Sequence, residues 1–394
     1  MPMITDTRTL ADFCQRLAGT PYITVDTEFM RETTYWPVLC LVQLAGPDEA
    51  RAVDALAEGI DLKPLCELMA DENVLKVFHA ARQDMEIFYH LMGALPAPVF
   101  DTQIAAMVCG FGDQVGYETL ISKLTRQRVD KSSRFTDWSL RPLSNRQIDY
   151  AMGDVTHLRP AYEKLCRKLQ GNGREGFLDE KMAVLCATET YDGDPYKAYL
   201  RIKSRGNKPR VMVVLRELAA WREIEARRRD LVRNRILRDE QVLEIAHHTP
   251  ATAAELARTR GLGRRFAEGH QGEQVLEAVK RGLDTPKEDW PRPESKPDIP
   301  RGIGPITDLL KVLLKMQCEA HEVAQKLLAS AADVELIAAF GEDAGVPALH
   351  GWRRQVYGEV ALKLRNGETA LALKGKEIRL VTPAPEAEAG RETG

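Results

Sequence analysis

Long hydrophobic runs are absent from this 394-residue sequence, and its cysteines are few and scattered. No stretch approaches the roughly 20 apolar residues that a membrane-spanning helix requires, which excludes an integral membrane protein. The first residues, MPMITDTRTLADF, contain two acidic residues and no apolar core, so no signal peptide is expected. The seven cysteines form no CxxC pair, which argues against a disulfide framework and a thiolate zinc site. These features predict a cytoplasmic protein.

Glycine-rich nucleotide-binding loops are also missing. The sequence contains no GxxxxGK[ST] motif, so no nucleotide-driven motor is expected. The segment GFGDQVG at 110–116 spaces its glycines as GxGxxxG and follows a helix-like segment, whereas a dinucleotide fingerprint follows a strand. The sequence therefore predicts no nucleotide cofactor.

Charge of one sign does not dominate the whole chain, but it dominates one segment. The formal net charge is −3, with 29% charged and 44% apolar residues, which is typical of a globular protein. Residues 201–238 contain 13 Lys/Arg against 4 Asp/Glu, a net charge of +9. This basic segment is either a solvated helix face or a contact surface for a polyanion.

Secondary-structure patterns divide the chain into an α/β part and two helical parts. Strand-like and helix-like segments alternate over 1–200, where strands are expected at 22–29, 39–45, 50–53 and 74–78, and helices at 62–69 and 82–92. Helical patterns fill 208–283 and then 306 to about 364. Six prolines between 284 and 305 predict an extended linker, and residues 382–394 are expected to be disordered.

Two acidic residues stand out in the first expected strand. Asp26 and Glu28 are two positions apart in an apolar run, so their side chains emerge on the same face of the strand. Carboxylates there repel each other and are costly to remove from water, and a bound cation relieves both effects. The alternative is that this face is exposed to solvent and has no function.

Three further residues complete a pattern. Asp84 lies near the start of a helix after the apolar run VLKVFHA, and Tyr150 and Asp154 lie four residues apart on one helix face. An acid in a first helical turn, or a Tyr–Asp pair on a helix, is common without any function. The specific signal is the order DxE, then Asp, then YxxxD along one chain.

This order of motifs resembles the DEDD superfamily of 3′→5′ exonucleases, in the subgroup with tyrosine in its third motif. VDTEF at 25–29, FHAARQD at 78–84 and YAMGD at 150–154 carry the resemblance. The surrounding segments TYWPVLCLVQLA, FDTQIAA and KSSRFTDWSLRPLS are similar to the bacterial ribonuclease D family in particular. The resemblance implies an α/β ribonuclease H-like exonuclease core with a mixed sheet flanked by helices. It also implies two all-α HRDC-like domains, at 208–283 and 306–381.

The resemblance further implies a two-metal active site. Asp26, Glu28, Asp84 and Asp154 are its expected ligands, and all-oxygen sites select hard cations, here Mg²⁺ or Mn²⁺. Tyr150 is expected to orient the attacking water, because a phenol with a pKa near ~10 is a poor base at neutral pH. The expected activity is trimming of RNA 3′ ends, in transfer RNA precursors and other small stable RNAs, with release of 5′-mononucleotides by a monomeric enzyme.

Several neighbouring residues are candidates for RNA binding. Phe29 either stacks on a terminal base or belongs to the core, and His79 either contacts the 3′ nucleotide or satisfies a buried hydrogen bond. Lys131, Arg134 and Arg141 lie in a loop-like segment where they either grip phosphates or are simply solvated. Two other functions remain open at this point: a DNA exonuclease of the same superfamily, and a non-catalytic RNA-binding relic.

Overall fold

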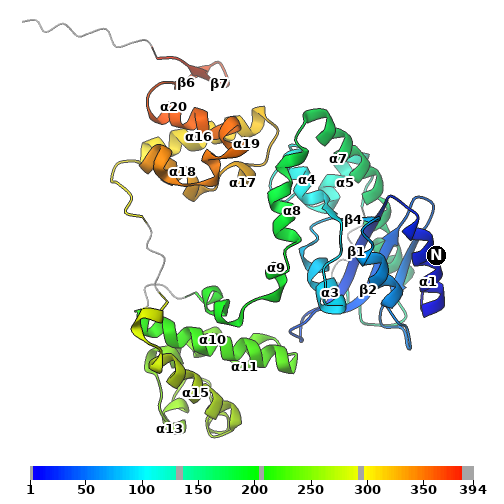
Figure 1. Ribbon diagram of the computed structural model, residues 1–394, viewed down its shortest axis with the longest axis vertical. Helices are drawn as coiled ribbons and strands as arrows, with labels where there is room; N and C mark the ends of the chain where they lie inside the picture. The colour runs from blue at the N-terminus through cyan, green and yellow to red at the C-terminus, as the bar shows by residue number, and fades with distance from the viewer. Residues whose placement is uncertain (1–2, 130–135, 204–207, 292–296, 384–394) are drawn as a thin grey trace, which may run out of the picture.

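The computed structural model describes residues 3–129, 136–203, 208–291 and 297–383 (Figure 1). An α/β domain, blue to green in Figure 1, is followed by a first helical domain in yellow-green and a second one in orange. Across these ranges, no helix has both the length and the apolar character needed to cross a membrane.

The α/β domain is built on a five-stranded mixed sheet with the strand order β3-β2-β1-β4-β5. Its strands are β1 (Tyr22–Met30), β2 (Val38–Ala45), β3 (Ala50–Asp54), β4 (Leu75–Phe78) and β5 (Val99–Asp101). β1, β2 and β3 pair antiparallel, whereas β1, β4 and β5 pair parallel. The central strand β1 therefore contacts both halves of the sheet.

Helices cover both faces of this sheet, and the alternation of side chains along β1 decides what each face carries. Ile23 and Val25 point into a core shared with α1, α2 and α3. Thr24 points to the other face, where its hydroxyl donates to the carbonyl of Val155 in α6 at 2.8 Å. The helices of this domain are α1 (Thr7–Ala18), α2 (Lys63–Ala70), α3 (Arg82–Met92), α4 (Thr102–Val108), α5 (Tyr117–Thr125), α6 (Asn145–Thr156), α7 (Leu158–Asn172), η1 (Glu175–Phe177), α8 (Asp179–Leu185), α9 (Glu189–Asp192) and η2 (Pro195–Arg201).

The first helical domain is centred on the 21-residue helix α10, which packs against α15. The two helices approach closely at Gly282, where a Cβ atom would lie only 2.7 Å from the Cα atom of Val214, so a side chain there has no room. The elements of this domain are α10 (Pro209–Arg229), α11 (Arg233–Ile236), α12 (Asp239–His248), α13 (Ala253–Leu256), α14 (Arg264–Ala267), α15 (His270–Asp284) and η3 (Lys287–Asp289).

The basic segment at 201–238 lies mainly in this domain, and much of its charge is neutralised there. Glu223 forms ion pairs with Arg201, Arg227 and Arg233. Arg222 pairs with Asp239 at 2.7 Å. These arginines therefore have a structural use within the domain, and the net charge of the segment overstates what is available to a polyanion.

The second helical domain packs on the α/β domain through a shared apolar core and several specific contacts. Trp352 stacks on Phe177 with ring centroids 4.0 Å apart, and Arg353 pairs with Glu180 at 2.8 Å. Its elements are α16 (Gly304–Ala320), α17 (Gln325–Leu328), α18 (Ala331–Phe340), η4 (Gly341–Ala344), η5 (Pro347–Leu349), α19 (Gly351–Arg353), the π-helical η6 (Arg354–Gly358), α20 (Glu359–Arg365), β6 (Ala370–Lys374) and β7 (Glu377–Val381).

The expected fold class is confirmed: a mixed sheet flanked by helices precedes helical domains. Two features were not expected. The strand β5 has only three residues, too short for a periodic signal. The hairpin β6–β7 adds two strands to a domain expected to be all-α, with Gly375 in its turn at a φ of +64° that favours glycine. The extended linker expected at 284–305 is described only in part, and its first residues are not extended, because η3 lies among them and Trp290 packs on the core of the first helical domain. Residues 384–394 lie outside the described residues.

Candidate active site

A cavity of about 880 Å³ opens where β1 meets α6. Its wall is formed by the second half of β1, the turn after β4, the start of α5 and one face of α6. The cavity lies on the same face of β1 as Asp26 and Glu28, which both line it. The site is therefore built from elements that are far apart in the sequence.

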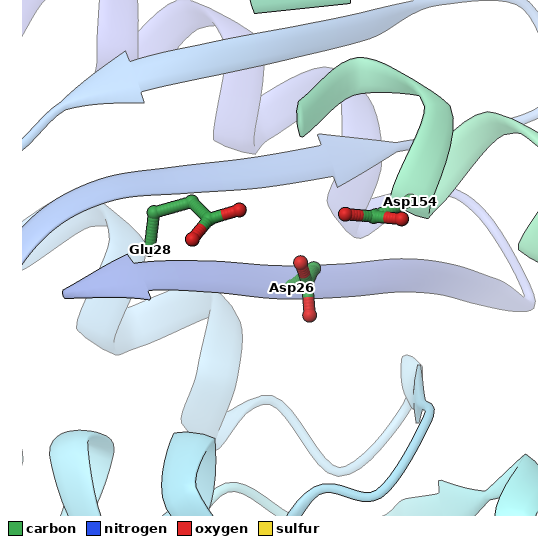
Figure 2. A group of neighbouring side chains, drawn as sticks. All are labelled: Asp26, Glu28 and Asp154. Atoms are coloured by element: carbon green, nitrogen blue, oxygen red, sulfur yellow. The ribbon is translucent and has the colours of Figure 1, made fainter. Parts of the chain in front are cut away.

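Three carboxylates meet in this cavity (Figure 2). Asp26 and Glu28 project from β1, and Asp154 projects toward them from α6. Each offers a carboxylate oxygen that lies within 4.8 Å of those of the other two. This spacing allows all three to ligate one cation.

Burial and mutual repulsion raise the pKa values of the two carboxyl groups on β1. Burial is the larger cause at Glu28, and the charges of Asp154 and Asp84 add to it, which raises the pKa of Glu28 to about 9. The pKa of Asp26 also lies well above its ordinary value, because of burial and then the charges of Asp154, Asp84 and Glu28. The three-carboxylate cluster thus stores unfavourable charge that a cation would relieve.

Asp84 approaches this cluster from the other side of β1. It is buried in the first turn of α3, and Thr27 donates a hydrogen bond of 2.5 Å to its carboxylate. Burial raises the pKa of Asp84 to about 7, and the hydrogen bond from Thr27 opposes that rise. Asp84 is not within 4.8 Å of all three other acids, so the structure brings together three of the four expected ligands and holds the fourth beside them.

The residues present fit a divalent cation. The donors are all carboxylate oxygens, the ligands that Mg²⁺ and Mn²⁺ prefer. Within the described part of the chain, no ion pair with a basic side chain neutralises Asp26 or Glu28.

Three other expected site residues line the same cavity: Tyr150, Phe29 and His79. The Tyr150 ring lies 6.1 Å from that of Trp138, a buried residue of the loop before α6. The Nδ1 atom of His79 lies 3.0 Å from the hydroxyl of Thr102, and burial lowers the pKa of this histidine. His79 is therefore neutral at neutral pH.

Of the three basic residues expected to bind phosphates, the structure describes only one. Lys131 and Arg134 lie outside the described residues. The guanidinium of Arg141 makes two bonds to the buried carboxylate of Asp54, at 2.8 and 2.5 Å, and three more to backbone carbonyls. All of its donors are directed into the protein, which speaks against the expected phosphate contact and indicates that Arg141 anchors its loop.

Sequence reasoning missed Tyr117. This residue lines the cavity at the start of α5, and its hydroxyl donates to the carbonyl of Gly153 at 2.8 Å. The pKa of Tyr117 is raised by burial and then by the charges of Asp154 and Asp26. Tyr117 directly follows the glycine-containing segment at 110–116, which is the only sequence signal near it.

Comparison with known proteins places this geometry in a family. A family model described as 3′-5′ exonuclease matches residues 1–170, and a model of the HRDC domain matches residues 212–279. The protein called Ribonuclease D from Granulibacter bethesdensis is 51% identical over 381 residues, which cover 96% of each chain. The chain belongs to the ribonuclease D family.

Other members of the ribonuclease D family agree with this assignment. Ribonuclease D from Nitrobacter hamburgensis is 50% identical and is matched over 99% of its length. The crystal structure of Escherichia coli RNase D superposes with a TM-score of 0.77 at 29% identity, covering 93% of this chain and 98% of that one. The resemblance stated from the three motifs and the HRDC-like segment is therefore confirmed.

Proposed function

We propose that this chain is a metal-dependent 3′→5′ exoribonuclease. It adds water across the terminal phosphodiester of an RNA, releasing a 5′-mononucleotide and leaving an RNA shortened by one residue with a free 3′-hydroxyl. The observation that carries the proposal is the cluster of Asp26, Glu28 and Asp154 in an open cavity of a ribonuclease D family member. The proposed site residues are Asp26, Glu28, Asp84, Tyr150 and Asp154.

The proposed roles follow from the chemistry of these side chains. Asp26, Glu28, Asp84 and Asp154 would hold two divalent cations, Mg²⁺ or Mn²⁺. When bound, such ions lower the pKa of water and stabilise negative charge on phosphate oxygens and the leaving oxygen. Tyr150 positions the attacking water through its hydroxyl, because an ordinary phenol pKa near ~10 makes it a weak base. Phe29 and His79 contact the terminal nucleotide from the cavity wall.

We extend the proposal to the substrate and the working form of the enzyme. The Escherichia coli relative is described as an exoribonuclease involved in structured RNA processing, which supports structured RNA as the substrate. We propose that the substrate is a structured RNA with a single-stranded 3′ tail. Transfer RNA precursors have this form. We also propose that the enzyme is monomeric and cytoplasmic. Light scattering of the purified chain tests whether it is a monomer.

The test uses a 5′-labelled RNA hairpin that carries a short 3′ tail. The wild type is incubated with Mg²⁺, Mn²⁺ or EDTA, and products are resolved at single-nucleotide steps. A ladder that shortens from the 3′ end only when metal is present is the expected result. Asp84→Asn is expected to abolish the ladder, and the exposed-site change Asp48→Asn to leave it intact.

A matched DNA hairpin is run beside the RNA. The metal chemistry does not distinguish ribose from deoxyribose, so faster degradation of the DNA would overturn the choice of RNA. RNA left intact under every condition, by a protein that binds it equally well with and without metal, would instead support the non-catalytic relic.

A further inference from the structure

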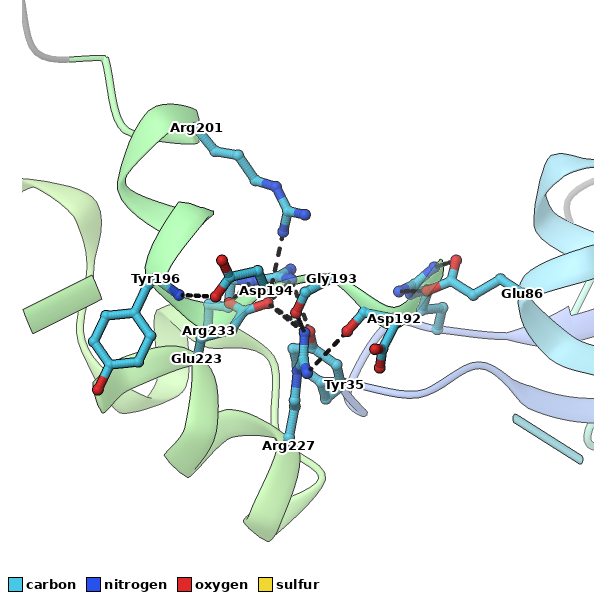
Figure 3. Close-up of polar contacts among 11 residues, drawn as sticks. Tyr35, Glu86, Asp192, Gly193, Asp194, Tyr196, Arg201, Glu223, Arg227 and Arg233 are labelled. Atoms are coloured by element: carbon cyan, nitrogen blue, oxygen red, sulfur yellow. Dashed lines mark hydrogen bonds and ion pairs between the residues drawn. The ribbon is translucent and has the colours of Figure 1, made fainter. Parts of the chain in front are cut away.

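The loop between β1 and β2, residues 31–37, inserts into the first helical domain (Figure 3). Tyr35 is the residue that enters, and only 7% of its surface is exposed. Its hydroxyl donates to a carboxylate oxygen of Glu223 at 2.5 Å and accepts from Arg227 at 3.0 Å and Arg233 at 3.1 Å. A single tyrosine from the α/β domain thus completes a buried polar cluster of the helical domain.

The same domain also holds the backbone of this loop. One carboxylate oxygen of Asp230 accepts the backbone N–H groups of Tyr35 at 3.0 Å and Trp36 at 2.9 Å. Asp230 ends α10 in the left-handed conformation, with a φ of +47°. The residue that ends α10 therefore binds the backbone of two consecutive residues of the loop.

On its other side, the loop contacts β1 and α3, two of the three elements that carry the expected metal ligands. It continues directly from β1, and Arg31 and Glu32 line the active-site cavity. Arg31 makes two bonds of 2.7 Å to Glu86 of α3. Glu86 is labelled at the right of Figure 3. The ring of Trp36 stacks on His90 of the same helix with centroids 4.4 Å apart. α3 is the helix whose first turn holds Asp84.

We propose that Asp230 and Tyr35 are positioning residues for the active site. By gripping loop 31–37, the first helical domain fixes the end of β1 against α3 and so sets the spacing of the carboxylates that bind metal. Such support is needed because like-charged carboxylates repel each other and spread apart unless their supporting elements are held. This inference rests on the proposed function and assigns the helical domain a role in metal binding, in addition to any contact with RNA.

The structure offers a matched pair of variants at position 230. Asp230→Gly tolerates the left-handed φ but removes the acceptor for both loop N–H groups. Asp230→Asn keeps an acceptor oxygen, and asparagine also tolerates this conformation. The two variants differ in the hydrogen bonds to the loop, with little change in backbone strain.

Two measurements on the full chain distinguish a role in positioning the metal-binding carboxylates from a role that only attaches the first helical domain. The first is Mn²⁺ binding without RNA, followed by electron paramagnetic resonance. The second is kcat and KM on a short single-stranded RNA, which occupies the active-site cavity. Loss of the two hydrogen bonds in Asp230→Gly is expected to weaken Mn²⁺ binding and lower kcat, each about five- to tenfold, with KM changed less than about twofold. Asp230→Asn is expected to restore both values.

Wild-type Mn²⁺ affinity and kcat in a folded Asp230→Gly variant would overturn the inference, and so would a loss confined to KM for long structured RNA. Circular dichroism establishes that each variant is folded. If Asp230→Gly does not fold, Tyr35→Phe, which keeps the buried ring and removes only the hydroxyl, takes its place with an expected effect of about threefold. A wild type that binds Mn²⁺ but leaves RNA intact would refute the proposed function, while the Mn²⁺ comparison would still decide the inference.

Discussion

The Thr27 hydroxyl donates a 2.5 Å hydrogen bond to the buried carboxylate of Asp84, joining β1 to the first turn of α3. Thr27 points to the face of β1 opposite Asp26 and Glu28, so one strand contacts the proposed ligands on both of its faces. Burial raises the pKa of Asp84 to about 7, and this hydrogen bond lowers it. The charge of Asp84 near neutral pH therefore depends on Thr27.

Replacing Thr27 by valine is expected to raise the pKa of Asp84 further, because burial then acts without the opposing hydrogen bond. A carboxyl group must lose its proton to hold a cation, so the rising limb of activity against pH should move up by roughly one pH unit. The measurement is kcat/KM from pH 5 to 9 at a Mg²⁺ concentration below saturation, where protons compete with the cation for the carboxylate. Thr27→Ser keeps the hydroxyl and should follow the wild type. An unchanged profile in Thr27→Val would show that Asp84 is not the titrating group.

Sequence patterns predicted the strands and helices that carry strong periodic signals. β1 is apolar on alternate positions, and α3 begins and ends at the expected residues. Tyr150 and Asp154 lie in one helix, α6, as expected, but the end of this helix at Thr156 and the start of α7 at Leu158 were not predicted. Boundaries of this kind depend on tertiary packing, which a local pattern does not contain.

The candidate site could be predicted only as a set of residues. Motif order identified the acids, but it gave no information on which of them share one face, and Asp84 proved to be on the far side of β1 beside Thr27. Arg141 looked like a loop cation because its partner, Asp54, is 87 residues away in sequence. Tyr117 belongs to none of the three motifs, and only the folded structure brings it into the active-site cavity.

The raised pKa of Glu28 predicts how metal-free stability depends on pH. Glu28 keeps its proton up to about pH 9 in the folded chain, whereas the unfolded chain releases it near the ordinary value of 4.5. The folded state therefore binds more protons between these values, and the free energy of unfolding falls as pH rises through this window. Thermal unfolding in EDTA should show the decline, and Glu28→Gln should make it shallower. Equal slopes for the two proteins would contradict the assignment.

Arg141 is predicted to act in stability and not in RNA binding. Arg141→Ala leaves the buried carboxylate of Asp54 without its partner, which should cost about 3 kcal/mol in the free energy of unfolding. Urea denaturation measures this loss. RNA affinity and its dependence on salt should be unchanged in the folded fraction, since no phosphate contact is lost. A shallower salt dependence would restore the phosphate-binding role expected from sequence.

Tyr117 is predicted to hold Asp154 in place through the backbone of α6. Tyr117→Phe removes the donor to the Gly153 carbonyl, so the residue next to Asp154 loses its anchor. We expect a destabilisation of about 1–2 kcal/mol and a severalfold lower kcat, with KM nearly unchanged. Tyr150→Phe is the comparison: it should lower kcat because its hydroxyl orients the attacking water. An unchanged stability and kcat in Tyr117→Phe would contradict the anchoring role of Tyr117.

The three-carboxylate cluster predicts that function and stability oppose each other at Asp26. Asp26→Asn keeps the shape of the side chain but removes one of the three carboxylates that can hold a cation, so hydrolysis should fall at least about a hundredfold. In EDTA the same variant should melt about 2–4 °C higher than the wild type, since the raised pKa of Asp26 means that the folded chain disfavours its charged form, and an amide avoids this cost of about 1 kcal/mol. Mg²⁺ should raise the melting temperature of the wild type and not that of the variant, because only the wild type gains ligand-linked stability.

Asp48→Asn, at an exposed position, is the control and should leave the rate of hydrolysis and both melting temperatures unchanged. A variant that melts lower than the wild type in EDTA would mean that Asp26 supports the fold itself, and the burial of this carboxyl group would then not be held at a cost to stability.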